Sequence, residues 1–213
     1  MIVGRLILQL VACVGLPVIG ISGPVEDLAA FREGERLVFD TTGHPKAKGV
    51  RMRFFYPHTW KAVDGSRPNI VQKFVSDAGK GQHWALIQTR ALPPELGGDL
   101  SEDAKRQVLT EDVLKEFVPP GGKFLSSAVT KIDGELCGMI EYETTSERVG
   151  LTLGQVGLMF VIPRPGTLLI LSFSTGGDGT SGLESIRRSY RIAKPLLLHM
   201  AALCVLSEKW KTP

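Results

Sequence analysis

The chain has 213 residues, enough for one domain of ordinary size or for a leader followed by one domain. Hydrophobic residues make up 43% of it and charged residues 22%, with 24 glycines and 13 prolines scattered along the chain. This composition excludes disordered, collagen-like and disulfide-dense proteins. The net charge of +3 is too small to predict nucleic-acid binding through bulk electrostatics.

The first 22 residues have the pattern of an export signal. One positive charge in Met1–Arg5 precedes a mostly apolar run from Leu6 to Ile21, and small residues near Ser22 suit cleavage there. Two alternatives stay open. The segment could remain as an uncleaved membrane anchor, or Cys13, at the end of the lipobox-like Leu-Val-Ala-Cys, could be acylated. The chain therefore divides into residues 1–22, a signal peptide or N-terminal anchor, and residues 23–213, a single globular domain, periplasmic or secreted.

Cleavage at this point leaves two cysteines in the mature chain. Cys137 and Cys204 could form one disulfide in an oxidising compartment. Cys137 falls on an expected strand, however, and Cys204 ends the apolar run 196–204. We therefore predict two buried, inert thiols.

In the first half of the chain the periodicity is mainly that of strands. Apolar runs and alternation predict strands at 37–40, 50–56, 70–76 and 84–90, with turns at 41–45 and 77–81. A loop is expected at 92–98. Ser101 is a candidate N-cap, followed by first-turn acids, for a helix that reaches about Val118 and is stopped by residues 119–122.

The second half predicts two hairpins and a terminal helix. The first hairpin joins 123–132 to 136–145 around Asp133-Gly134, and the second joins 156–162 to 167–174 around 163–166. A glycine-rich loop at 176–182 then leads into helical sequence over 183–206, with Pro195 as the point of a break or restart. The part from Pro195 to Leu206 is apolar nearly all round, so it is buried or docks a partner, and it is too short to span a bilayer.

Hairpin connections favour a mainly antiparallel sheet covered by helices, which is the α+β class. Alternation along 136–145 places Leu136, Ile140 and Tyr142 on one face. On the other face Cys137 and Met139 give way to Glu141 and Glu143, so one end of that face is wet.

One segment carries a resemblance to a known family. Residues 50–61, Val-Arg-Met-Arg-Phe-Phe-Tyr-Pro-His-Thr-Trp-Lys, form a strand that closes on Tyr-Pro-x-x-Trp and resembles the opening strand of the PsbP-like superfamily. That superfamily includes the photosystem protein PsbP, the Ran-binding import factor Mog and many bacterial exported proteins. The resemblance covers roughly Leu37 to Leu206 and implies an α/β/α sandwich with a central antiparallel sheet. Tyr56 and Trp60 would be core anchors, with no catalytic role implied.

The motifs with chemical potential are weak. Gly177 to Gly182 matches G-x-G-x-x-G between a strand and a helix, but too little chain follows to complete a dinucleotide-binding unit. A flexible loop, or a weak anion nest, is the expectation. The histidines, at positions 44, 58, 83 and 199, have no metal-helix spacing, and His199 is expected in a core or at its rim.

Charged residues supply two further candidates. Glu141 and Glu143 could do acid–base work if one pKa were raised, but a solvated sheet end facing Lys or Arg is favoured. Arg187, Arg188, Arg191 and Lys194 form a basic helical stretch in which Glu184 is spaced to pair with Arg188. It could contact an anionic membrane or an acidic partner, although a solvated helix face is favoured. No G-x-S-x-G nucleophile motif is present.

Taken together, these patterns predict an exported, non-enzymatic binding or assembly module that acts on a protein partner in the periplasm. The alternative is a small-ligand or metal-binding periplasmic protein that uses the sheet end near Glu141 and Glu143 with a nearby histidine. A hydrolase of unrecognised type is the third possibility. No catalytic, cofactor or metal residue is assigned, no nucleic-acid partner is expected, and membrane contact is expected only through residues 1–22 if they are retained.

Overall fold

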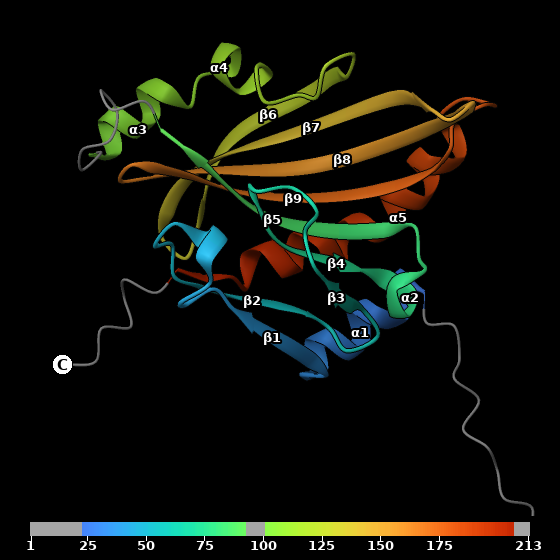
Figure 1. The fold of residues 1–213 in the computed structure, drawn as a ribbon, viewed down its shortest axis with the longest axis horizontal. Coiled ribbons are helices and arrows are strands. Elements are labelled where there is room, and N and C mark those ends of the chain that lie inside the picture. The colour runs from blue at the N-terminus through green and yellow to red at the C-terminus, as the bar shows by residue number, and fades with distance from the viewer. Residues whose placement is uncertain (1–22, 93–100, 207–213) are drawn as a thin grey trace, which may run out of the picture.

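The computed structural model describes residues 23–92 and 101–206, which form two antiparallel sheets and the helices that pack on them (Figure 1). The helices are α1 (Pro24–Glu33), α2 (Ser76–Gly79), α3 (Glu102–Val108), α4 (Glu111–Lys115) and α5 (Glu184–Ala202), with a 3-10 turn, η1, at Pro45–Ala47. The strands are β1 (Arg36–Asp40), β2 (Met52–Pro57), β3 (Lys61–Val63), β4 (Ile70–Val75), β5 (His83–Ala91), β6 (Lys123–Ile132), β7 (Glu135–Arg148), β8 (Leu151–Arg164), β9 (Thr167–Asp178) and β10 (Val205–Leu206).

The larger sheet has seven strands in the order β3-β4-β5-β9-β8-β7-β6. Every pair in it is antiparallel, and β6 to β9 form a continuous meander in which each strand pairs with the next. β5 joins this meander through a nine-residue ladder with β9. The α+β class with a central, mainly antiparallel sheet is therefore confirmed.

One face of this sheet carries the main core. Helix α5 and the smaller sheet, in the order β1-β2-β10, pack against it, and α1 packs on α5 and β2. Phe31 of α1, Phe54 of β2 and Leu197 of α5 are fully buried there with Leu158 and Phe173 of the large sheet. The close packing of these aromatic and branched side chains holds α5 across β8 and β9.

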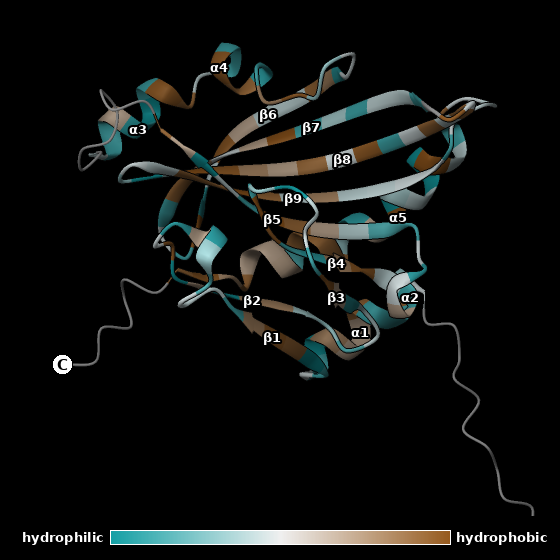
Figure 2. Ribbon diagram, in the orientation of Figure 1, coloured by the Kyte–Doolittle hydropathy of each residue, from teal (hydrophilic) through white to brown (hydrophobic). Residues whose placement is uncertain are grey.

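The opposite face is covered only in part. Leu109 and Leu114, from the segment of α3 and α4, pack on Leu136, Ile140 and Val161 and their neighbours to form a second, separate cluster. In Figure 2, β7 and β9 become paler or teal toward the β7–β8 hairpin, whereas β8 keeps brown segments close to it. Helices thus lie on both faces of the sheet, but only half of this second face is covered.

Several predicted elements are corrected in extent. The single helix expected from residue 101 to 118 is two, because Thr110 has an extended backbone and begins α4 as its N-cap while Leu109 turns into the core. The hairpin strands are longer than predicted, since backbone pairing continues through the polar stretch from Thr144 to Gln155. α1, α2 and the short strand β3 were not predicted.

The chain's C-terminal part differs most. Pro195 lies inside α5 without breaking it, on an exposed side of the helix, so the carbonyl that loses its intrahelical donor can bond water. The helix ends at Ala202, and the predicted continuation to Leu206 is wrong. Residues Val205 and Leu206 instead pair with β2, and the Leu206 amide donates to Asp133 Oδ2 at 2.9 Å. The predicted leader, its cleavage site, Cys13 and most of the expected loop at 92–98 lie outside the described residues.

Candidate functional site

The uncovered half of the large sheet forms a groove of about 700 Å³. Its floor is built by β4, β5, β9, β8 and β7, and its wall by the loop that follows β3. The residues that line it are Val63, Asp64, Gly65, Ser66, Arg67, Ile70, Lys73, Trp84, Leu86, Gln88, Thr144, Ser146, Leu153, Gly154, Gln155, Gly176 and Gly177. Its size and its mixed polar and apolar lining are within the range of ligand-binding sites.

Trp84 is a fixed apolar platform on this floor. Its indole lies against Gly176 of the neighbouring strand so closely that a Cβ at position 176 would clash with ring carbons Cη2 and Cζ3. The Lys73 ammonium stands 5.8 Å from the ring centroid. Because glycine makes room for the ring, one indole face rests on the backbone and the ring is held in place before any ligand arrives.

Polar side chains from alternate strand positions surround the platform. Gln155 Nε2 donates to Tyr142 Oη and to Ser174 Oγ, both at 2.8 Å, and the Tyr142 ring occupies the space that a Cβ at Gly157 would need. Burial raises the pKa of Tyr142, so its phenol is neutral at physiological pH. This network holds the floor rigid and presents amide and hydroxyl groups.

A second polar contact lies nearer β4. Gln88 Nε2 donates to Ser172 Oγ at 2.9 Å, and Asn69 Nδ2 lies 3.4 Å from Gln88 Oε1. The groove therefore has an aromatic centre with amides on both sides, a combination suited to binding by stacking and hydrogen bonds.

Two cations at the groove have no carboxylate partner. Lys73 and Arg67 both line it, and within residues 23–92 and 101–206 no ion pair involves either one. Asp64 is the acidic residue of the lining. No histidine, cysteine or glutamate is among the described residues that line the groove.

The β7–β8 hairpin extends the groove with an exposed apolar tip. Leu153 lines the groove, Leu151 is 64% exposed, and Val149 is fully exposed. Val149 has φ +49 and is followed by Gly150 at φ +74, the backbone of a tight hairpin turn. A β-branched residue at such a φ is strained by about 1–2 kcal/mol, and apolar exposure and strain together are features of contact surfaces.

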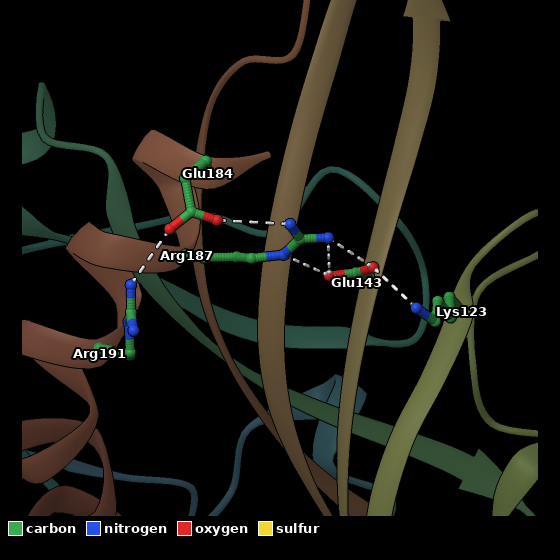
Figure 3. A network of polar contacts seen from close by, with 5 residues as sticks. All are labelled: Lys123, Glu143, Glu184, Arg187 and Arg191. Carbon is green, nitrogen blue, oxygen red and sulfur yellow. Dashed lines mark hydrogen bonds and ion pairs between the residues drawn. The ribbon is translucent and has the colours of Figure 1, made fainter. Parts of the chain in front are cut away.

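Glu141 and Glu143 lie on the α5 side of β7, on the opposite face from the groove, and cations neutralise both. Arg187 donates from Nε to Glu143 Oε2 at 2.9 Å and from Nη2 to Oε1 at 3.0 Å, and Lys123 Nζ lies 3.8 Å from Oε1 (Figure 3). The hydrogen bonds from Arg187 lower the pKa of Glu143. Glu141 accepts hydrogen bonds from Lys194 and from Tyr190.

The two glutamates do face Lys and Arg, as expected, but the solvated sheet end that the sequence favoured is corrected for Glu143, which is only 6% exposed. The hollow beside them, about 380 Å³, has no histidine among its described lining residues. Across the described residues no group of three or more His, Cys, Asp or Glu side chains could hold a metal ion.

The basic stretch of α5 is corrected in its pairing. Glu184 pairs with Arg187 at 3.6 Å and with Arg191 at 3.3 Å, and not with Arg188 as the sequence predicted (Figure 3). Arg187 and Lys194 reach β7, so this face is partly engaged with the sheet and is not simply solvated. These ion pairs, from Arg187 to Glu143 and from Lys194 to Glu141, fasten α5 to strand β7.

The histidines are dispersed. His83 is buried, with Nδ1 2.8 Å from Thr175 Oγ1, and burial lowers its pKa to about 4. His199 is half-buried with its ring edge-on to Phe31 at 6.1 Å, as expected for a core rim. His44 caps η1, and His58 is exposed near Glu35.

Both cysteines of the domain are free and buried, which confirms the prediction of inert thiols. Burial raises the pKa of Cys137 to about 12 and also raises that of Cys204. Neither thiol is therefore a nucleophile at neutral pH.

The glycine-rich motif is partly strand. β9 runs through Asp178, so only residues 179–183 connect it to α5, and Asp178 Oδ1 accepts from the amide and hydroxyl of Thr180. The motif is the short turn that aims α5 back across the sheet.

Tyr56 and Trp60 are buried core residues, as the resemblance implied. Trp60 Nε1 donates to Asp27 Oδ2 at 3.0 Å, and Thr59 Oγ1 donates to Asp27 Oδ1 at 2.7 Å. The motif therefore anchors the unpredicted helix α1.

Sequence reasoning did not identify the groove. The available signal was polar or small residues at alternate positions of otherwise apolar strands, namely Gln88, Gln155, Ser172 and Ser174. That alternation marks a wet sheet face, but only the packing of α3 and α4 shows which half stays open.

None of the helices in the part of the chain described here is both long and apolar enough to cross a membrane. No family model and no curated protein matches the sequence. Solved structures do match the fold. PsbP (CyanoP) from Synechocystis sp. PCC 6803 is 16% identical, with a TM-score of 0.49, over 81% of this chain and 92% of that one.

Two further structures extend this similarity. The Ran-binding protein Mog1p of Saccharomyces cerevisiae is 8% identical, with a TM-score of 0.49, over 82% of this chain and 97% of that one. LpqN, involved in cell envelope biogenesis of Mycobacterium tuberculosis, is 11% identical, with a TM-score of 0.39, over 83% of this chain and 96% of that one. The solved structures similar to this chain thus include PsbP and Mog1p.

Proposed function

We propose that this chain is a non-enzymatic binding module of the periplasm that holds an acidic segment of a partner protein in the groove on the open half of its sheet. The observation that carries the proposal is the Trp84 platform, fixed over Gly176 with Lys73 beside its ring, in a groove that Arg67 also lines; neither cation has an ion-pair partner among the described residues.

The groove has the chemistry of a protein interface. Tryptophan and arginine dominate the binding energy of such interfaces, and hydrogen-bonding side chains around them supply specificity. Since the Trp84 ring is already immobilised by its contact with Gly176, little side-chain entropy is lost when a partner covers it. The exposed tip at Val149 and Leu151 would add apolar contact beside the groove.

Charge selects the kind of partner. A carboxylate above the groove would meet Lys73 and Arg67, which have no ion-pair partner in the described chain, and would approach a site partly shielded from water by the indole. A basic segment would face two like charges there. Complementarity of this kind steers association and rejects wrong partners.

Site-specific cross-linking tests the proposal in living cells. A photoreactive phenylalanine analogue placed at Leu86, on the groove floor, should give a covalent adduct with one protein. The charge reversals Lys73→Glu and Arg67→Glu should reduce that adduct at least tenfold. The matched control places the same analogue at Arg188, an exposed position on α5, across the sheet from the groove. Equal yields of the same adduct from positions 86 and 188, or no adduct from position 86, would contradict the proposal that the groove binds a partner.

The compartment is tested separately. The predicted leader at residues 1–22 supports export. The intact mass of the protein from fractionated cells should correspond to a soluble species that starts near Gly23. A species that keeps Met1, or that starts at an acylated Cys13, would place the domain at a membrane instead.

A further inference from the structure

The strand β6 is a long free edge of the seven-stranded sheet. All of its ten residues except the bulged Leu125 pair with β7 on one side, and no strand in the described part of the chain pairs with the other side. The opposite edge of the same sheet, β3, has three residues, and the edge strand β10 of the small sheet has two. Short edges limit unwanted pairing, whereas β6 presents a long row of unpaired amides and carbonyls.

Features that protect an edge are confined to the ends of β6. A bulge lies between Phe124 and Ser126, and the charged residues are Lys123 and Lys131. Both lysines are held against their own chain, Lys123 Nζ at 3.8 Å from Glu143 and Lys131 Nζ at 2.6 Å from Glu102. Between them the segment 126–130, Ser-Ser-Ala-Val-Thr, has no charge, no proline and no bulge.

From this edge we infer that β6 pairs antiparallel with β6 of a second copy of the chain, so that the sheet continues across a two-fold axis at Ala128. In this register Ser126 faces Thr130 and Ser127 faces Val129 of the other copy. Each facing pair lies on the same side of the sheet, as the pleat requires. Small and β-branched side chains therefore meet along the central contact from Ser126 to Thr130.

Self-complementarity is the reason for choosing a second copy as the partner. Lys131 of one copy comes opposite the bulged Leu125 of the other, not opposite a lysine, so no like charges meet. Val129 and Leu125, both 42% exposed, gain cover from this pairing. A segment of another protein would find on β6 no unpaired charge to select it, whereas an identical strand matches the edge residue for residue.

The two-fold position gives a sharp test. The processed protein should sediment with twice the mass of one chain at micromolar concentration. Ala128→Lys and Ala128→Glu each place like charges face to face on the axis, and each should raise the dimer dissociation constant at least tenfold. An equimolar mixture of the two variants should restore the dimer, because a lysine then faces a glutamate.

The control variant is Ala62→Lys on β3, an exposed position at the other edge of the same sheet, which should leave the dimer unchanged. A wild type that stays monomeric up to several hundred micromolar overturns the inference. The inference is also overturned if Ala128→Lys dimerises like the wild type. A third refuting result is a mixture of Ala128→Lys and Ala128→Glu that stays monomeric although each variant retains the native circular dichroism spectrum.

Discussion

Acid should destabilise this protein through one buried histidine. His83 is 5% exposed, and burial lowers its pKa from 6.5 to about 4, with a smaller opposing effect from the charge of Asp27. Between these pH values the unfolded chain binds a proton that the native state excludes. The stability that His83 contributes is therefore complete above about pH 6.5 and is lost as the pH falls toward 4. A shift of this size corresponds to about 3 kcal/mol.

Urea unfolding followed by circular dichroism, in steps from pH 7.5 to pH 4, measures this contribution. His83→Gln keeps a hydrogen-bonding amide near Thr175 but cannot titrate, so its free energy of unfolding should fall by about 3 kcal/mol less than that of the wild type over this range. Carboxylates titrate in both proteins and cancel in the difference. His58→Gln, at an exposed histidine, is the control. Parallel pH curves for wild type and His83→Gln would refute the reasoning.

Four further results are expected. Gly176→Ala should displace the Trp84 ring and cost about 1–3 kcal/mol of stability in urea unfolding. It should also reduce the yield of the cross-link formed from position 86. Unchanged tryptophan emission and unchanged cross-linking would contradict the contact of the Trp84 ring with Gly176. Arg187→Met should lower the urea midpoint of unfolding at pH 7, and by more than the more exposed Arg191→Met does, because Arg187 also bonds the buried Glu143. Because the native pKa of Glu143 is depressed, the cost of Arg187→Met should be present above pH 4.5 and fade as the pH falls through that native pKa; a cost that stays constant until acid itself unfolds the protein argues against the pair. Val149→Asn should raise the free energy of unfolding by about 1 kcal/mol and weaken partner binding, and a loss of stability would show that the turn is not strained. Cys137 and Cys204 should resist iodoacetamide in the native protein and react once it is unfolded, so rapid native alkylation, read by mass, would disprove their burial.

Local patterns predicted the sheet well because hairpins depend on neighbours in sequence. Asp133-Gly134 provides the two positive φ values, +48 and +79, that join β6 to β7. The alternation along 136–145 also sorted Ile140 and Tyr142 from Cys137 and Met139 correctly onto two faces. These signals act over a few residues, so one sequence contains them in full.

What could not be predicted depends on distant partners. Helix α1 has little apolar periodicity of its own and is held through Asp27 by Thr59 and Trp60, more than 30 residues away. Pro195 predicts a break, but burial of Leu196 and Leu197 on the sheet outweighs the lost hydrogen bond. For the same reason Glu184 pairs with Arg187, because the position of α5 over Glu143 sets the direction of that arginine.

The groove shows the same limit for function. Lys73, Trp84 and Gln155 lie on three different strands, and Gly176 acquires its importance only because the indole of Trp84 lies against it. No spacing in the sequence connects these positions, since the order of strands β4-β5-β9-β8 is a property of the complete sheet.

That strand order also governs how the molecule reaches its native state. The meander from β6 to β9 closes through short turns, but the ladder between β5 and β9 joins residues such as His83 and Thr175 that lie 92 positions apart. Closing so long a loop loses chain entropy before the ladder compensates for it. We therefore expect the meander to assemble first, with β3 to β5 docking late. The floor of the groove, which spans this seam, would then be among the last surfaces to form, so a nascent chain could not engage its partner until folding was complete.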